Sequence, residues 1–228
     1  MKTISETILE YAHSVPEGRV LSPKEFLHMG NRTAVDQALS RLSREGHLIR
    51  VDRGAYVAPV RRGGGSRPPS AKKVIESLAA LSGELIAPDG ASSAMVFGLA
   101  KQGWAAPCYV TTGRSRILTL GEVEVVLRHS PAWMLVLANE PAGAAVRVMA
   151  WLGPEDTSKA LPKIRRSLSS SEWMSLVACR ASLPSWMARA VGESDLQEIP
   201  GRQLRRLVAA DATAEALAQA SNQPMSTA

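Results

Sequence analysis

Apolar residues recur at helical spacing between residues 31 and 46. One stripe at positions i, i+3, i+4 and i+7 is formed by Val35, Ala38, Leu39 and Leu42. Asn31 is a favourable N-cap residue, and Gly46 is typical of the position that follows a helix. The pattern therefore predicts a helix over residues 31–46 with one buried apolar face and one polar face.

The segment after this helix has the pattern of short strands. Two β-prone runs, residues 48–51 and 55–58, flank Asp52-Arg53-Gly54, and a short glycine-containing connection between such runs predicts a β-hairpin. Upstream, residues 3–14 predict a first helix, because their apolar positions follow the helical period. Residues 19–21 predict a strand that is long enough to pair with the hairpin.

A second helix is expected to begin at Ser22. Ser22 and Glu25 form a capping box, and Pro23 is favourable in the first turn of a helix. This helix would end at Gly30, where the chain turns into the helix described first. The order helix, strand, helix, turn, helix, hairpin predicts a winged helix-turn-helix domain over residues 1–60.

The composition changes after this domain. Residues 61–70 contain arginine, glycine, proline and serine but no apolar residue to bury, which predicts a basic, flexible Gly/Pro linker. A larger α+β domain with a small antiparallel sheet is expected over residues 71–200, followed by a C-terminal helix and disordered tail over 201–228. The predicted strands are 85–87, 107–112, 116–120 and 123–128, and the predicted helices are 71–83, 91–100, 133–137, 143–151, 157–168, 171–180, 184–191 and 202–220.

Charge and apolar content narrow the class of protein. The chain has 228 residues, a formal net charge of +6 and a sequence pI of about 9.7, which favours an anionic partner. No apolar run approaches the roughly 20 residues of a membrane span, and Glu6 and Glu10 argue against a signal peptide. Cys108 and Cys179 lie among apolar neighbours, as free thiols of a reducing compartment do. We therefore expect a cytoplasmic protein with no membrane partner.

The polar face of the 31–46 helix carries side chains suited to reading DNA. Gln37 can pair with adenine, and Arg41 can donate two hydrogen bonds to guanine. Phosphates can be contacted from the helix and from the hairpin. The predicted DNA-binding residues are Arg32, Thr33, Gln37, Ser40, Arg41, Arg44, Arg50 and Arg53. An ordinary amphipathic surface helix, or a winged helix that binds protein, is the alternative interpretation.

A second candidate lies between two predicted strands, in Thr111-Thr112-Gly113-Arg114-Ser115-Arg116. Its hydroxyl groups, backbone N–H groups and arginines can hold a phosphate or a partner, as anion-binding turns do, with Thr112, Arg114 and Arg116 as the contacts. It lacks the spacing of a P-loop. A plain basic hairpin is the alternative interpretation.

Catalysis has little support in the sequence. The four histidines do not have metal-ligand spacing. Ala91-Ser92-Ser93-Ala94 lacks the Gly-x-Ser-x-Gly elbow of hydrolases, and the five tryptophans lie in apolar runs, which favours core packing. We expect a protein that is not an enzyme and that uses no metal and no cofactor.

Three motifs together resemble one known family. Residues 49–59, Ile-Arg-Val-Asp-Arg-Gly-Ala-Tyr-Val-Ala-Pro, resemble the end of the N-terminal domain of AbiEi-type antitoxins. Residues 85–94 and 109–116 resemble segments of the second domain in the same family, in its branch of winged-helix proteins. The resemblance covers roughly residues 5–192.

This resemblance implies a bacterial antitoxin of a toxin–antitoxin or abortive-infection gene pair. Such antitoxins bind inverted repeats in double-stranded DNA at their own promoter and repress it, and their partner is a nucleotidyltransferase-like toxin. The resemblance supports DNA contact by the 31–46 helix and the hairpin, but not a particular operator sequence. A module that neutralises a partner without DNA, and a solitary transcriptional regulator, are the alternatives. The oligomeric state stays open.

Overall fold

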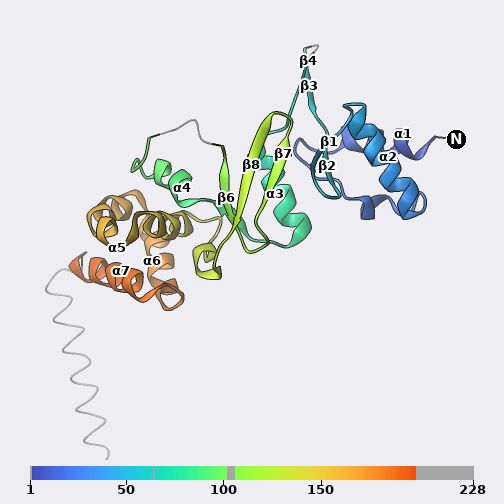
Figure 1. Ribbon diagram of the computed structural model, residues 1–228. Coiled ribbons are helices and arrows are strands. Elements are labelled where there is room, and N and C mark those ends of the chain that lie inside the picture. Colours follow the sequence, from blue (N-terminus) through green and yellow to red (C-terminus); the bar gives the residue numbers. More distant parts are fainter. Residues whose placement is uncertain (1, 64, 102–105, 199–228) are drawn as a thin grey trace, which may run out of the picture.

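The computed structural model describes residues 2–63, 65–101 and 106–198. The expected helix over 202–220 and the expected tail lie outside these residues. The fold is α+β, as predicted, with helices at both ends of an elongated molecule and a sheet between them (Figure 1). The N-terminal part contains α1 (Ile4–Ser14), η1 (Pro23–Phe26), α2 (Arg32–Arg44), β1 (Ile49–Asp52) and β2 (Ala55–Val57).

The predicted caps form, but the second helix is shorter than predicted. Asn31 caps α2 by accepting a hydrogen bond from the Ala34 N–H at 2.9 Å. The Ser22 capping box is also present, yet it starts only η1, a 3-10 helix of four residues. Within this helix only Pro23 and Phe26 are buried, so no apolar stripe of two turns supports a longer helix.

The β1–β2 hairpin lies between two buried clusters. Leu21 bridges Tyr56, which confirms the predicted pairing of residues 19–21 with the hairpin. Tyr56 packs with α1 and α2, whereas its neighbours Ala55 and Val57 face the other way. This second face belongs to a cluster shared with the second half of the chain: Val20, Val51, Ala55 and Val57 pack with Val74, Ile75, Leu78, Ile86, Leu118, Leu120, Val125 and Leu127.

The expected flexible linker is wrong for most of its length. Residues 60–67 form a second antiparallel hairpin, β3 (Val60–Arg62) and β4 (Gly65–Arg67), with Val60 opposite Arg67. Gly63, with φ of 52°, adopts the left-handed conformation that tight hairpin turns require. Of the glycines that suggested flexibility, Gly63 therefore serves a turn and Gly65 begins a strand.

The chain that follows is held against the N-terminal part by Glu17. Its carboxylate accepts hydrogen bonds from Lys73 Nζ at 2.7 Å and from the Ser70 backbone N–H at 3.1 Å, and it forms an ion pair with Arg67 at 3.3 Å. Lys73 and Ser70 lower the pKa of Glu17 to about 2. A Cβ atom on Gly18 would lie 2.6 Å from Lys73 Cβ, so this residue permits the close approach.

The second part contains a four-stranded sheet of order β5-β6-β8-β7. Its strands are β5 (Ile86–Pro88), β6 (Cys108–Thr111), β7 (Arg116–Leu120) and β8 (Val123–His129). The predicted β7–β8 hairpin is confirmed, but β6 and β8 are parallel, so the sheet is mixed rather than antiparallel. The helix α3 (Ala71–Ser82) contributes Val74, Ile75 and Leu78 to the shared cluster.

The remaining helices form a separate core beyond the sheet. They are α4 (Gly90–Val96), η2 (Ala132–Leu135), α5 (Pro141–Ser167), α6 (Ser170–Ala178), η3 (Cys179–Ser182) and α7 (Ser185–Glu198). The predicted helices over 143–151 and 157–168 join as α5, which kinks at Gly153. Trp173 is buried as predicted, but Trp151 is 49% exposed.

Candidate nucleic-acid interface

The α2 helix presents the polar face that its sequence predicts. Its four predicted apolar residues are all buried. On the opposite side Thr33, Gln37, Arg41 and Arg44 are exposed, and Ser40 is partly exposed. One helix therefore carries two exposed uncharged hydrogen-bonding side chains, Thr33 and Gln37, and three exposed arginines, Arg32, Arg41 and Arg44.

Two of the predicted arginines are held by neighbours. Arg32 forms an ion pair with Asp36 one turn later, with Nε and Oδ2 2.8 Å apart. Arg41 donates a hydrogen bond to the Ser5 hydroxyl of α1, which restricts the position of its guanidinium. The contact with Ser5 joins residues 36 positions apart, and no local sequence signal predicts it.

Gln37, Arg41 and Arg44 share one groove between α1 and α2. The groove has a volume of about 530 Å³ and is lined by Ile4, Ser5, Ala34, Gln37, Ala38, Arg41 and Arg44. Within the described part of the chain Arg44 has no ion pair with a carboxylate, so its charge faces solvent. The groove is therefore lined by two basic side chains, Arg41 and Arg44, beside the Gln37 amide.

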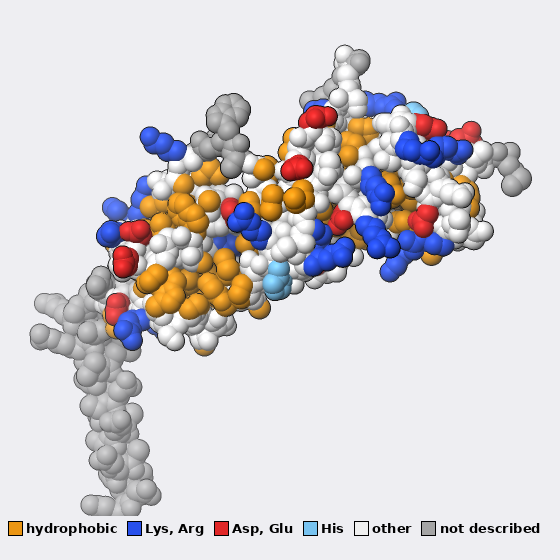
Figure 2. Space-filling model, in the orientation of Figure 1, with side chains coloured by type: hydrophobic (Ala, Val, Ile, Leu, Met, Phe, Trp, Pro, Cys, Tyr) orange, Lys and Arg blue, Asp and Glu red, His pale blue; other side chains and the backbone are white. Residues whose placement is uncertain are grey.

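The hairpin adds further exposed arginines. Arg50 on β1 and Arg53 in the turn are exposed, and neither forms an ion pair with any residue that the structure describes. Arg61 on β3 has its Nη2 atom 3.5 Å from His47 Nδ1, so the second hairpin contacts the chain just after α2. Figure 2 shows Lys and Arg side chains spread over the N-terminal part, including α2 and the hairpins. This surface can attract a polyanion.

The turn between β6 and β7 does not have the predicted character. Arg116 is only 11% exposed at its side chain and forms ion pairs with Asp52 at 3.1 Å and with Glu84 at 3.0 Å. Glu84 also accepts a hydrogen bond from the Thr111 hydroxyl at 2.8 Å. A carboxylate thus occupies the turn and pairs with the Arg116 charge, which disfavours the predicted phosphate contact at Arg116.

The other two predicted residues of this turn are exposed. Thr112 accepts a hydrogen bond from the Leu85 N–H at 3.1 Å, and Arg114 faces solvent. The turn therefore presents the exposed guanidinium of Arg114, which forms no ion pair with the described residues, close to the acidic Glu84. Sequence reasoning missed Glu84 because it lies 32 positions from Arg116 and precedes a different strand.

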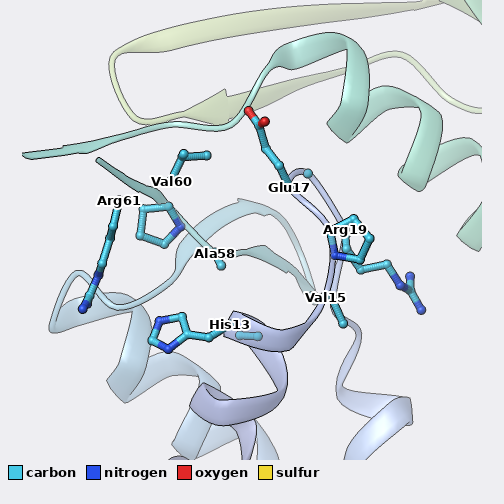
Figure 3. A pocket seen from close by; sticks show the side chains of 11 residues that line it. His13, Val15, Glu17, Arg19, Ala58, Val60 and Arg61 are labelled. Atoms are coloured by element: carbon cyan, nitrogen blue, oxygen red, sulfur yellow. The ribbon is translucent and has the colours of Figure 1, made fainter. Parts of the chain in front are cut away.

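A cavity of about 360 Å³ lies between the end of α1 and β3, but its charged residues are engaged elsewhere. Figure 3 shows Glu17 and Arg19 at its wall, with the guanidinium of Arg19 directed away from the other labelled side chains. Arg19 forms an ion pair with Glu25 at 3.0 Å, and Glu17 binds the chain entering α3. All of its lining residues come from residues 12–19 and 58–61, and the charges of Glu17 and Arg19 are already paired.

The described residues lack both a cluster of metal ligands and a membrane-spanning helix. They contain no group of three or more His, Cys, Asp or Glu side chains placed to hold a metal ion. None of their helices combines the length and the apolar character that a membrane span requires.

Comparisons with known proteins give one family and one structure. Residues 7–174 match DUF6088, a family of unknown function. The crystal structure of the RV2827C protein from Mycobacterium tuberculosis is similar over 84% of this chain and 75% of that chain, with 16% sequence identity and a TM-score of 0.49. No curated protein matches the chain.

Proposed function

The chain belongs to the DUF6088 family, whose function is unknown, and we propose that its N-terminal part is a winged helix-turn-helix that binds double-stranded DNA. The order α1, bridge at Leu21, η1, α2 and β1–β2 hairpin supports this assignment. The observation that carries the proposal is the exposed row of Gln37, Arg41 and Arg44 on α2, next to a hairpin with two exposed arginines.

Each side chain has a defined role in this proposal. Gln37 and Arg41 contact base edges in the major groove, where amide and guanidinium groups distinguish adenine and guanine. Ser5 orients the Arg41 guanidinium before DNA arrives, which reduces the conformational entropy lost on binding. Arg44, Arg50 and Arg53 contact phosphates and fix the position of α2 on the duplex.

The resemblance to AbiEi-type antitoxins extends the proposal to regulation. The protein would act in the cytoplasm and repress its own promoter at an inverted repeat, paired with a nucleotidyltransferase-like toxin encoded next to it. A solitary regulator would lack that neighbouring gene. A module that neutralises a partner without DNA would show no salt-dependent mobility shift with its own upstream region.

Binding of Gln37→Ala and Arg53→Ala to the upstream region and to random DNA tests the proposal. Gln37→Ala should weaken specific binding by about 1 to 3 kcal/mol and random binding much less. Arg53→Ala should weaken both and flatten the slope of log K against log salt concentration by about 0.9. The control is Arg166→Ala, which removes an exposed arginine from α5. Full affinity of both test variants on both DNAs would overturn the proposal.

A further inference from the structure

One arginine of the second part is buried without a matching acceptor. Arg147 on α5 is 2% exposed, and its Nε and Nη1 atoms have no hydrogen-bond partner among the residues that the structure describes. Burial lowers the pKa of Arg147 to about 10, so its side chain is still charged at neutral pH. A buried guanidinium with unmatched donors is costly, and such groups in proteins normally meet an anion or a set of acceptors.

The same arginine lines a cavity of about 240 Å³. The cavity lies where α4 and β6 approach α5, and its walls are Pro88, Ser92, Ser93, Val96, Pro107, Cys108, Tyr109, Ala144 and Arg147. Proline, valine and alanine side chains make most of this wall apolar, while the hydroxyl groups of Ser92 and Ser93 add polar positions. The cavity thus combines a mostly apolar lining with one cationic side chain, that of Arg147.

Asp89 is the acidic residue that interacts electrostatically with Arg147. It favours the charged form of Arg147, but no ion pair joins the two side chains in the described part of the chain. One Asp89 oxygen already accepts a hydrogen bond from the Ser92 N–H at 2.8 Å as the cap of α4. Asp89 therefore offsets part of the Arg147 charge and leaves the two guanidinium donors unmatched.

We propose that this cavity is a binding site for a small organic carboxylate, with Arg147 holding the carboxylate and the apolar wall holding its body. A charged guanidinium donates short, strong hydrogen bonds to a carboxylate, and an unmatched Arg147 donor can supply such a bond. The cavity is smaller than the roughly 300 to 1,000 Å³ of pockets for drug-sized ligands, so the body of the ligand is about the size of one ring.

The chain contains a reporter for the site and an internal control. Cys108 lines the cavity, and burial raises the pKa of its thiol. Cys179 is the other free cysteine of the chain, lies at the end of α6 and contributes nothing to this cavity. Alkylation of each thiol by iodoacetamide at alkaline pH, followed by mass spectrometry, measures access to each position separately.

Benzoate is the probe, and benzyl alcohol is its uncharged control of similar shape. Benzoate should slow alkylation of Cys108 by the factor 1 + [L]/Kd, about tenfold at a concentration of about ten times Kd, without changing Cys179. Benzyl alcohol should not protect Cys108. Arg147→Met should remove the protection, whereas Arg166→Met, which removes an exposed arginine from the end of α5, should keep it.

The outcomes decide between a carboxylate site and a buried charge alone. Equal protection by benzyl alcohol, or unchanged protection in Arg147→Met, would overturn the proposal because the cation would have no role. Absence of protection by benzoate would also overturn it. If Arg147→Met does not fold, the comparison of the two probes on the wild-type protein still decides the matter.

Discussion

Arg116 is a basic residue whose role is set by its position in the fold rather than by its charge alone. Its guanidinium lies between Asp52 at the end of β1 and Glu84 ahead of β5. The first carboxylate belongs to the N-terminal part and the second to the other part. One side chain therefore forms ion pairs with two half-buried acids and joins both parts of the chain.

Replacing Arg116 with leucine should destabilise the protein strongly. Asp52 and Glu84 would lose the cation between them, and breaking a buried pair in this way costs about 3 to 5 kcal/mol. Both carboxylates retain some exposure, so we expect about 2 to 4 kcal/mol in a urea unfolding experiment. Arg114→Leu, which removes a neighbouring exposed arginine, should stay within about 0.5 kcal/mol of the wild type. Equal effects of the two substitutions would show that the ion pairs add nothing.

At the scale of elements, local signals predicted where helices and strands begin better than where they end. Asn31 and Ser22 both form their predicted caps, because capping depends on a few adjacent residues. The length of η1 depends instead on what its later residues pack against. The hairpin of residues 60–67 and the parallel pairing of β6 with β8 were missed because they depend on partners set by the tertiary fold.

The stability that Glu17 provides by binding Ser70 and Lys73 at the start of α3 should depend on pH. The pKa of Glu17 is about 2 in the folded protein and 4.5 as its ordinary value, so the folded state favours the charged carboxylate. Its stabilisation is fully present above pH 4.5 and is lost as pH falls through 2. The difference in unfolding free energy between wild type and Glu17→Gln should therefore be largest near neutral pH and shrink below pH 4.5.

The control for this experiment is Glu122→Gln. Glu122 is an exposed acid in the β7–β8 turn and forms no ion pair with the residues that the structure describes. The Glu122→Gln substitution removes the same charge as Glu17→Gln but removes no contact between the two parts. A pH-independent difference between wild type and Glu17→Gln would contradict the assigned role of the Glu17 carboxylate.

At the scale of the whole molecule, the two predicted domains share a core. Val20 and Val57 of the N-terminal part are fully buried against Leu118 and Val125 of the sheet. The Val20 N–H also donates a hydrogen bond to the Ser77 hydroxyl on α3 at 2.8 Å. The apolar pattern identified these residues as buried, but it could not say that they bury one another, because they lie far apart in the sequence.

This shared core leads us to expect one cooperative unfolding transition. All five tryptophans lie between residues 104 and 186, so their fluorescence reports the second part alone. Leu39 is fully buried in the other cluster, with α1 and Tyr56, and Leu39→Ala should cost about 2 to 5 kcal/mol. If the parts unfold together, this substitution shifts the tryptophan transition as far as it shifts the far-ultraviolet circular dichroism transition.

The control is Thr119→Ala, on the exposed side of β7, which should change the unfolding free energy by no more than about 0.5 kcal/mol with either probe. A tryptophan midpoint that stays at its wild-type value in Leu39→Ala would mean that the second part folds independently of the DNA-binding part that we propose.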